Sequence, residues 1–194
     1  CKRKKNRENG RREMKDIYAK IRGYLFTLKC RLMRRNIVIG SRLQLYCRLE
    51  IKGVGKVFIG NDCIVSKIIG DSRHYVTIYT HDPSATVSIG NNARLFAARI
   101  SSKFAIQAGD NLLIEESGIM DTDFHSLSSD RKDPMENRNQ CRVVIGNRVS
   151  IGARSVICKG VTVGDDVIVW PGSIINKSVP SGVAVCGNPV RLVK

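Results

Sequence analysis

The sequence predicts a single all-β solenoid domain, a β-helix, because it repeats every six residues. The first observation is a row of aliphatic residues in the C-terminal half, at Ile145, Ile151, Ile157, Val163, Val169 and Ile175. The second is a row of small or β-branched residues four places further into each unit, at Val149, Ser155, Val161, Val167, Ser173 and Val179. A six-residue period fits neither a helix nor a simple alternating strand. It is typical of a β-helix, in which each hexapeptide forms one short face and a turn.

Weaker repeats extend this domain towards the N-terminus, so that we expect it to span about residues 37–190. Six-residue spacing relates Ile39, Leu45 and Ile51, and again Ala108, Ile114 and Met120. A step from an aliphatic residue to glycine also occurs at Ile39, Ile59, Ile69 and Ile89. We expect the aliphatic side chains to stack into one continuous core. Gly-Asn and Gly-Asp steps are expected in tight corners that need a positive φ.

The composition is that of one soluble domain. A length of 194 residues and a hydrophobic content of 42% are ordinary for such a domain. No apolar run approaches the roughly 18–20 residues of a membrane span, and the N-terminus lacks the apolar core of a signal peptide. Seven cysteines without a C-x-x-C pair predict reduced thiols and a cytoplasmic protein.

The net charge of +16 is concentrated at the N-terminus. Residues 1–36 hold 14 lysines and arginines against three acidic residues, a net charge of +11. Residues 1–13 are predicted to form a basic tail. Residues 14–36 carry apolar residues at three- and four-residue spacing, which indicates an amphipathic helix. This stripe comprises Met14, Ile17, Tyr18, Ile21, Leu25, Leu28 and Leu32.

Two interpretations of the N-terminal helix stay open, and both can hold together. One is that the helix caps the open end of the solenoid core. The other is that residues 1–36, the basic tail and the helix together, bind the anionic surface on the inner side of a membrane. Nucleic-acid binding is disfavoured, because aromatic residues are few among the basic ones and no recognition motif is present.

The repeat breaks once, between about residues 121 and 144, where a polar, proline-containing stretch cannot continue the aliphatic core. Long loops on rigid scaffolds are often functional. His125 stands at the base of this predicted excursion loop, just after Asp121 and Asp123. A histidine oriented by a carboxylate is suited to deprotonate an alcohol as a general base. On the residues alone, the alternative that His125 is an ordinary surface residue stays open.

The segment 145–180 and the closing Cys186-Gly-Asn-Pro-Val-Arg-Leu-Val-Lys resemble the hexapeptide-repeat O-acetyltransferases, a group that includes galactoside, capsular polysaccharide and O-antigen acetyltransferases. The resemblance covers about residues 106–194. It implies a left-handed parallel β-helix, an exception to the usual right-handed crossover rule. It also implies a homotrimer that binds acetyl-CoA between neighbouring subunits, needs no metal, and acetylates a saccharide hydroxyl of a surface glycan or its precursor.

The same resemblance implies roles for single residues. His125 lies on the family's catalytic histidine, which takes a proton from the acceptor hydroxyl before this attacks the thioester directly. Positions that match cofactor-contacting residues are Ala153, Asn176, Lys177, Arg191 and Lys194. Arg191 and Lys194, in the basic C-terminal end 191–194, match cations that approach the nucleotide phosphates. The alternative for these two is that they are merely solvated terminal charges.

Two neighbouring positions depart from the family pattern, since Trp170 and Pro171 stand where Gly-Ala is usual. Pro171 has no N–H group, so we expect a backbone contact to the cofactor arm to be missing there. Trp170 is the only tryptophan of the chain. It either stacks on the cofactor or the acceptor, or packs against a neighbouring subunit.

Two other classes of function stay open as alternatives. Some β-helix trimers are zinc carbonic anhydrases that use three histidines, and this chain has His74, His81 and His125, at a spacing unlike theirs. The second alternative is a catalytically inactive scaffold trimer. The favoured prediction is an acetyl-CoA-dependent O-acetyltransferase with His125, supported by Asp123 and Asp121, at its catalytic centre.

Overall fold

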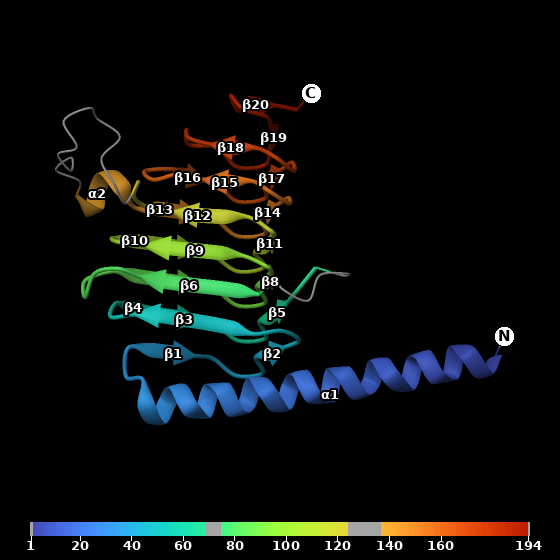
Figure 1. Cartoon of the computed structure of the whole chain (residues 1–194). Helices are drawn as coiled ribbons and strands as arrows, with labels where there is room; N and C mark the ends of the chain where they lie inside the picture. The colour runs from blue at the N-terminus through green and yellow to red at the C-terminus, as the bar shows by residue number, and fades with distance from the viewer. Residues whose placement is uncertain (1, 69–74, 124–136, 194) are drawn as a thin grey trace.

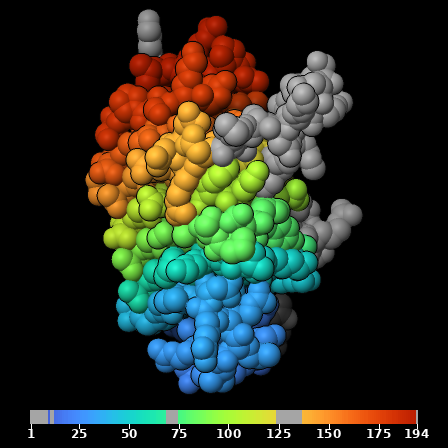
Figure 2. All heavy atoms as spheres, turned by 90° about the vertical axis from the view of Figure 1, so that its left-hand side faces the viewer, coloured from blue at the N-terminus to red at the C-terminus, as the bar shows by residue number. Residues whose placement is uncertain are grey.

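The structure is a computed structural model that describes residues 2–68, 75–123 and 137–193. Within these ranges the chain winds into a stack of coils, with one long helix across the N-terminal end of the stack (Figure 1). The first and last coils lie at opposite ends of the stack (Figure 2). Consecutive strands along the chain belong to three different sheets in turn, so each full coil contributes one strand to each sheet.

Each sheet runs the length of the stack. Sheet A contains β1 (Ile37–Ile39), β4 (Lys56–Ile59), β7 (Thr86–Ile89), β10 (Ala105–Ala108), β13 (Val143–Ile145) and β16 (Thr162–Val163). Sheet B contains β2 (Gln44–Leu45), β5 (Ile64–Ser66), β8 (Arg94–Phe96), β11 (Leu113–Glu115), β14 (Ser150–Ile151), β17 (Ile168–Val169), β19 (Ala184–Cys186) and β20 (Arg191–Leu192). Sheet C contains β3 (Leu49–Gly53), β6 (Val76–Thr80), β9 (Arg99–Ser102), β12 (Gly118–Met120), β15 (Val156–Ile157) and β18 (Ile174–Ile175).

Neighbouring coils pair in parallel, as a β-helix requires; the terminal pair of β19 and β20 is antiparallel. Three rows of turns join the sheets. The turns that follow the strands of sheet A form the A–B edge. Those that follow the strands of sheet B form the B–C edge, and those that follow the strands of sheet C form the C–A edge. The predicted parallel β-helix is therefore confirmed. Its left-handed winding stays a prediction from the resemblance.

The six-residue rows form the core. Every member of the two rows predicted in the C-terminal half is buried. Upstream, the predicted register slips at one strand, because Met120 is partly exposed and Ile119 is buried in its place. The buried positions of β11 and β12, Ile114 and Ile119, are five residues apart rather than six. The turn between these two strands is therefore one residue shorter than the repeat predicts.

A ladder of Asn and Asp side chains runs along the A–B edge. Asn61 donates its backbone N–H to the side-chain oxygen of Asn91 at 2.9 Å, and Asn91 does the same to Asp110 at 2.7 Å. The ladder continues from Asp110 to Asn147 at 2.9 Å and from Asn147 to Asp165 at 2.6 Å. Each of these side chains satisfies a backbone donor of the preceding coil, so the edge holds successive coils in register.

The glycines before these ladder residues have a different role from the one predicted. The positive φ angles of this edge fall on the residues after the ladder positions, namely Arg42, Asp62, Asn92, Asn111, Arg148 and Asp166. Gly60 instead lies so close to the next coil that a Cβ atom would be 2.6 Å from the carbonyl carbon of Gly90. Close approach of two backbones, rather than a left-handed φ, therefore explains the glycine at this position.

A second insertion interrupts the stack, so the prediction of one excursion loop was wrong. Nine residues separate β5 from β6, whereas two separate β8 from β9 at the same edge. Ile69 and Gly70, taken above as a repeat step, fall in this insertion and lie outside the described residues. An aliphatic–glycine step in an insertion has the same sequence signature as a true corner, which explains the error.

Helix α1 (Lys2–Met33) is longer than the predicted segment 14–36. It begins within the predicted basic tail, because lysine, arginine and glutamate are good helix formers, and it ends three residues earlier than expected. The helix covers the first coil, so it caps the core as one of the two interpretations requires (Figure 1). No helix in the described ranges is long and apolar enough to cross a membrane.

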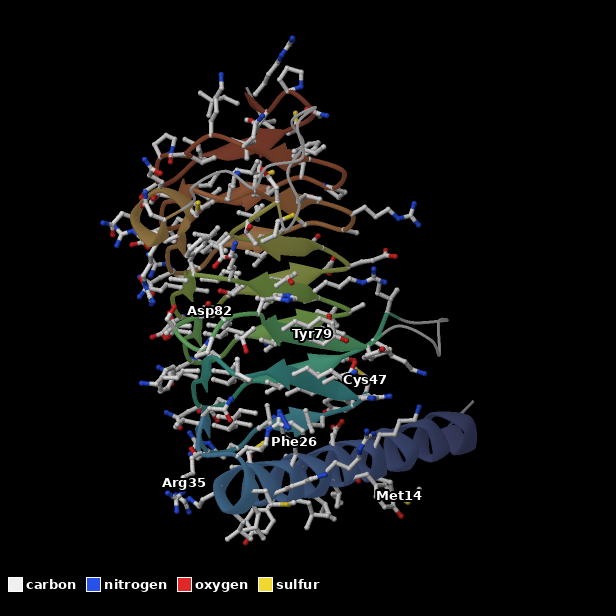
Figure 3. The ribbon with its side chains drawn as sticks, turned by 60° about the vertical axis from the view of Figure 1, so that its left-hand side comes forward. Met14, Phe26, Arg35, Cys47, Tyr79 and Asp82 are labelled. Carbon is white, nitrogen blue, oxygen red and sulfur yellow. The ribbon has the colours of Figure 1, made fainter. Side chains whose placement is uncertain are left out.

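The face of α1 that meets the first coil is not the predicted apolar stripe. Ala19 and Cys30 are buried against the coil, and Phe26 packs beside them, between the helix and the stack (Figure 3). Gly23 lies directly against the backbone of Leu43, where any Cβ would clash. Small residues are needed on this face because the helix lies close to the backbone of the coil. The predicted stripe therefore points away from the stack.

We predict that Gly60→Ala lowers the free energy of unfolding by about 1–3 kcal/mol, because the added Cβ forces two stacked backbones apart. Gly118→Ala is the matched control, since a Cβ added there meets no atom within 4 Å. The control should change the free energy by less than about 1 kcal/mol. Urea unfolding at fixed protein concentration compares the two variants. Equal destabilisation would contradict the close-approach explanation.

Candidate active site

Asp121, at the start of the predicted excursion, is a fully buried residue of the C–A edge. Its carboxylate accepts hydrogen bonds from the Ser102 hydroxyl at 2.6 Å and from the backbone N–H groups of Lys103 and Phe104 at 2.7 and 2.9 Å. Ser102 ends β9, and Lys103 and Phe104 lie in the turn that follows it on the same edge, so Asp121 joins two coils. These contacts are structural, and the catalytic role assigned to Asp121 stays a prediction.

Asp123 lies on the same edge and is partly exposed. Its carboxylate forms an ion pair with Lys159 at 2.6 Å, across to the turn of the next coil. A partly exposed pair of this kind contributes little to stability, about 0–1 kcal/mol. Its effect is positional, because it holds a carboxylate in place where residues 124–136 begin.

Cys158 lies beside this ion pair. Burial raises the pKa of the Cys158 thiol, and the negative charge of Asp123 raises that pKa further. The thiolate is the nucleophilic form of cysteine, so Cys158 is mostly protonated and unreactive at neutral pH. None of the six cysteines in the described part of the chain forms a disulfide.

The other end of the excursion is fixed by helix α2 (Arg138–Cys141). Asn137 caps this helix, since its side chain accepts the backbone N–H of Gln140. The Arg138 guanidinium donates to the Ser84 carbonyl at 2.9 Å and to the Thr86 hydroxyl at 2.6 Å. Ser84 lies in a turn of the same C–A edge, and Thr86 begins the strand β7 that follows it. Both ends of the excursion are therefore attached to one edge of the stack, at Lys159 on one side and at Ser84 and Thr86 on the other.

His125, the predicted general base, lies outside the described residues, as do His74 and Lys194. The remaining histidine, His81, lies on the C–A edge with its ring Nε2 2.9 Å from the Ser101 hydroxyl. A zinc site of three histidines stays an alternative prediction, since two of the three lie outside the described ranges.

Three of the residues at positions predicted to border the cofactor lie together on the B–C edge. Ala153 and Pro171 occupy equivalent positions in stacked turns, and Trp170 precedes Pro171. The Gly172 N–H donates to the Ala153 carbonyl at 2.8 Å, and the Pro171 ring lies directly over Gly152, where a Cβ would be 2.8 Å from it. The Trp170 side chain is 50% exposed beside this stack.

Buried serines hold these turns in place from inside. The Ser155 and Ser173 hydroxyls both donate to the carbonyl of Trp170, at 3.1 and 2.6 Å. Ser173 in turn accepts the N–H of Gly187 at 3.0 Å, and Ser117 donates to the Gly152 carbonyl at 2.7 Å. The backbone that carries Ala153 and Trp170 is therefore fixed by hydrogen bonds across consecutive coils.

Arg191 extends this column towards the C-terminal end. Strand β19 pairs with β17 and β20 pairs with β19, which places Arg191 opposite Cys186, two strands beyond Trp170. Arg191 is exposed. Within the described part of the chain, the B–C edge therefore carries Ala153, then Trp170 and Pro171, and then Arg191 beyond the layer of Cys186.

Asn176 and Lys177 lie elsewhere. They follow β18 and occupy the C–A edge, one coil beyond Cys158 and Lys159, and both are exposed. One chain therefore presents two groups of predicted site residues on two different edges, with sheet C between them. The first group is Ala153, Trp170, Pro171 and Arg191, and the second is Asp121, Asp123, Asn176 and Lys177.

Charge differs along the B–C edge. A groove of about 680 Å³ extends along this edge from α1 to Ala153. Its lining includes Phe96 and the acidic residues Glu115 and Glu116. Glu116 forms a long ion pair with Arg154 at 3.6 Å. On the N-terminal side of Ala153 the edge therefore carries Glu115 and Glu116, with Lys67 and Lys15 further along the groove. On the C-terminal side it carries the cation Arg191.

Sequence reasoning missed Lys159 and Arg138. Lys159 has a detectable signal, because it lies 18 residues, or one coil, before Lys177 and occupies the same place in its repeat. Arg138 has none, since its partners lie more than 50 residues away, in a turn with no distinctive motif.

We predict unequal losses of stability from two neighbouring substitutions. Asp121→Asn should lower the free energy of unfolding by about 1–3 kcal/mol, because an amide group would face buried donors in place of a carboxylate. Asp123→Asn should cost less than about 1 kcal/mol, since it removes only a partly exposed pair. Urea unfolding measures both. Equal losses of stability would contradict the structural role given to Asp121.

The comparisons with known proteins agree with this architecture. Residues 142–177 match the family described as bacterial transferase hexapeptide (six repeats). The chain is 29% identical over 120 residues to the galactoside O-acetyltransferase of Escherichia coli (strain K12). That alignment covers 58% of this chain, and it spans only 59% of the curated relative.

Solved structures share the fold. The polysialic acid O-acetyltransferase OatWY superposes with a TM-score of 0.60 at 22% identity, covering 81% of this chain and 73% of the other. The S84T mutant of AntD, an N-acyltransferase from Bacillus cereus in complex with dTDP and coenzyme A, also gives 0.60, at 20% identity and with 84% and 86% coverage. The resemblance to the hexapeptide-repeat acetyltransferases predicted from the sequence is therefore confirmed.

Proposed function

We propose that this chain is an acetyl-CoA-dependent O-acetyltransferase acting on a saccharide hydroxyl. The observation that carries the proposal is its similarity, over 120 residues, to a galactoside O-acetyltransferase. The fold it shares with a polysialic acid O-acetyltransferase supports the same chemistry. A surface glycan or its precursor in the cytoplasm is the acceptor that the proposal favours.

In this proposal His125 is the general base. It takes the proton of the acceptor hydroxyl while the oxygen attacks the thioester carbonyl carbon. A C–O bond forms, the C–S bond breaks, and the proton passes from His125 to the leaving thiolate, which departs as coenzyme A. A neutral imidazole accepts the proton best when a carboxylate stabilises the imidazolium that forms.

Asp123 is the better placed of the two predicted carboxylates for that supporting role. Asp121 is occupied by three hydrogen bonds to the neighbouring coil. Asp123 is partly exposed, two residues before His125, and Lys159 holds its position. The proposal therefore assigns the orientation of His125 to Asp123 and the support of that carboxylate to Lys159.

Direct transfer is favoured over a covalent acetyl-cysteine. Cys158 lies close to Asp123, but its raised pKa keeps it protonated at neutral pH. A nucleophilic cysteine needs the opposite, a lowered pKa in a positive environment. The acetyl group is therefore proposed to pass to the acceptor in one step.

A homotrimer explains why the predicted residues occupy two edges. Parallel stacks packed side by side place the C–A edge of one subunit next to the B–C edge of its neighbour, in a heterologous interface that closes into a ring. Asp123 and Lys177 of one subunit would then face Trp170 and Arg191 of the next. Trp170, half-exposed in one chain, would be covered there by the cofactor or by the neighbour.

The charge along the B–C edge favours one orientation of acetyl-CoA. Its phosphates need cations, and Arg191 lies on the C-terminal side of Ala153. Lys194, three residues after Arg191 in the sequence, is the second cation that the resemblance implies. Glu115 and Glu116, in the layer on the N-terminal side of Ala153, would repel the phosphates, while Lys67 and Lys15 lie further along the groove. The nucleotide is therefore proposed at the C-terminal end of the edge, with the pantetheine arm passing Trp170 towards Ala153.

The second candidate is N-acyl transfer to an amino sugar. It is favoured by the fold shared with AntD, an N-acyltransferase in complex with dTDP and coenzyme A. Assaying a panel of neutral sugars, amino sugars and nucleotide sugars distinguishes O- from N-transfer. Absence of transfer to all of them would favour the alternative of an inactive scaffold.

We predict that His125→Ala lowers turnover by about two to four orders of magnitude, as expected for loss of a general base. Release of the coenzyme A thiol in the presence of acceptor measures it. Cys158→Ser is the matched control and should retain activity, because the proposal gives that thiol no chemical role. Near-normal turnover of His125→Ala would refute the mechanism, and an inactive Cys158→Ser would indicate a covalent intermediate.

We predict that two defective variants complement each other in mixed trimers. Arg191→Ala with Lys194→Ala should raise the Michaelis constant for acetyl-CoA more than it lowers turnover. When this double variant is refolded or co-expressed in equal amounts with His125→Ala, about a quarter of the sites regain both intact edges, because each site draws on two subunits. Activity is measured at low acetyl-CoA. No recovery in proven mixed trimers would contradict a shared site.

A further inference from the structure

The apolar stripe of α1 is exposed on the side of the helix opposite the stack. Tyr24 joins the seven residues of the predicted stripe on this side. The members are then Met14, Ile17, Tyr18, Ile21, Tyr24, Leu25, Leu28 and Leu32, each between 39 and 74% exposed. With 3.6 residues per turn, these positions fall on the face opposite Ala19, Gly23, Phe26 and Cys30. Met14 lies on this outer side and Phe26 on the inner side (Figure 3). The helix therefore has two faces, one against the first coil and one that the chain itself leaves uncovered.

Basic residues border the exposed stripe on both sides. Lys15, Arg22 and Lys29 are seven residues apart and form one row along the helix, and Lys20 and Arg31 lie on the other side of the stripe. All five are exposed. An apolar face between two rows of long cations is the pattern of a helix that lies in a membrane interface, where apolar side chains enter the bilayer and cations reach the headgroups.

We infer that the outer face of α1 docks the protein onto the surface of an anionic lipid bilayer. The helix is too polar to cross a membrane, so it would lie along the interface. Residues 1–36, with their net charge of +11, would supply the attraction to anionic headgroups. This inference is independent of the proposed activity, since it uses no residue of the candidate active site.

A second copy of the chain is a less suitable occupant. Two such helices packed face to face would bring their rows of lysine and arginine together, and like charges repel at that distance. Side-by-side packing of parallel stacks leaves the stripe open as well, because α1 crosses the end of the stack (Figure 1). The exposed side chains of its stripe face away from the coils. In a parallel trimer, three stripes would face the same bilayer.

The orientation of the docked protein follows from the position of the helix. Helix α1 lies across the stack, close to perpendicular to the direction in which the coils pile up (Figure 1). A bilayer that binds its outer face would hold the stack upright, with the first coil nearest the lipid. The C-terminal coils, with Trp170 and Arg191, would point away from it.

Flotation of the full-length protein with vesicles tests the inference. The vesicles are phosphatidylcholine alone, or phosphatidylcholine with phosphatidylglycerol at about three to one. The wild type should float with the anionic vesicles, bind the neutral ones at least about tenfold more weakly, and be released by high salt. Ile21→Ser with Leu25→Ser should weaken binding to anionic vesicles at least about tenfold, because it removes apolar contact from the centre of the stripe.

Val54→Ser with Phe58→Ser is the matched control. These side chains are also apolar and exposed, at 61 and 40%, but they lie on the coils rather than on the helix. The control should bind as the wild type does. Circular dichroism and gel filtration check that both double variants keep the fold and the assembly, and thiol release with a soluble acceptor reports the activity separately.

Two outcomes would overturn the inference. One is that the wild type fails to bind anionic vesicles, or that Ile21→Ser with Leu25→Ser binds them unchanged. The other is that the wild type self-associates through the stripe, shown by concentration-dependent assembly that this variant abolishes without any vesicle binding. Loss of acetyl transfer alone would leave the docking result intact, so failure of the proposed function and failure of docking are distinguishable.

Discussion

The rest of the structure depends on the close parallel stacking of one coil on the next. Neighbouring strands must lie about 4.8 Å apart to pair, so residues at equivalent places in successive coils touch. This contact explains the buried rows, the Asn and Asp ladder and the glycine at position 60. It also builds the candidate active site, where Asp121 binds the preceding coil and Asp123 binds the following one.

The same stacking explains which features of the structure could be predicted from the sequence. A contact that repeats at a fixed interval leaves a period, and both rows of the C-terminal half were predicted correctly from it. Where a coil changes length the period is lost, as in the one-residue slip at Met120 and the insertion after β5. The excursion of about residues 121–144 was recognised because its polar composition cannot fill the core. The role of Arg138, which fixes the far end of this excursion, could not be recognised, because the partners of Arg138 belong to a coil that is distant in the sequence.

The N-terminal helix shows why an apolar stripe does not by itself indicate a buried face. A helix that packs on a flat coil must come close to its backbone, and Ala19 and Gly23 permit that approach. Bulky residues such as Tyr18 and Leu25 would hold the helix away. The capping face is therefore the one on which Ala19 and Gly23 allow close approach, with the apolar side chains of Phe26 and Cys30 packed beside them. Periodicity predicted the helix correctly, but it could not identify which face meets the stack.

The regular spacing of the coils sets the distance between helix α1 and the candidate active site. The C–A turn with Asp121 and Asp123 follows β12, three strand spacings from β3 in sheet C, which is about 15 Å along the stack. A helix adds about 10 Å, so a bilayer on the outer face of α1 would lie about 25 Å from that turn. A hydroxyl at the lipid headgroup could not reach it. An acceptor tethered to the same membrane would have to present a sugar several units from its anchor, because the number of coils sets the height of the site.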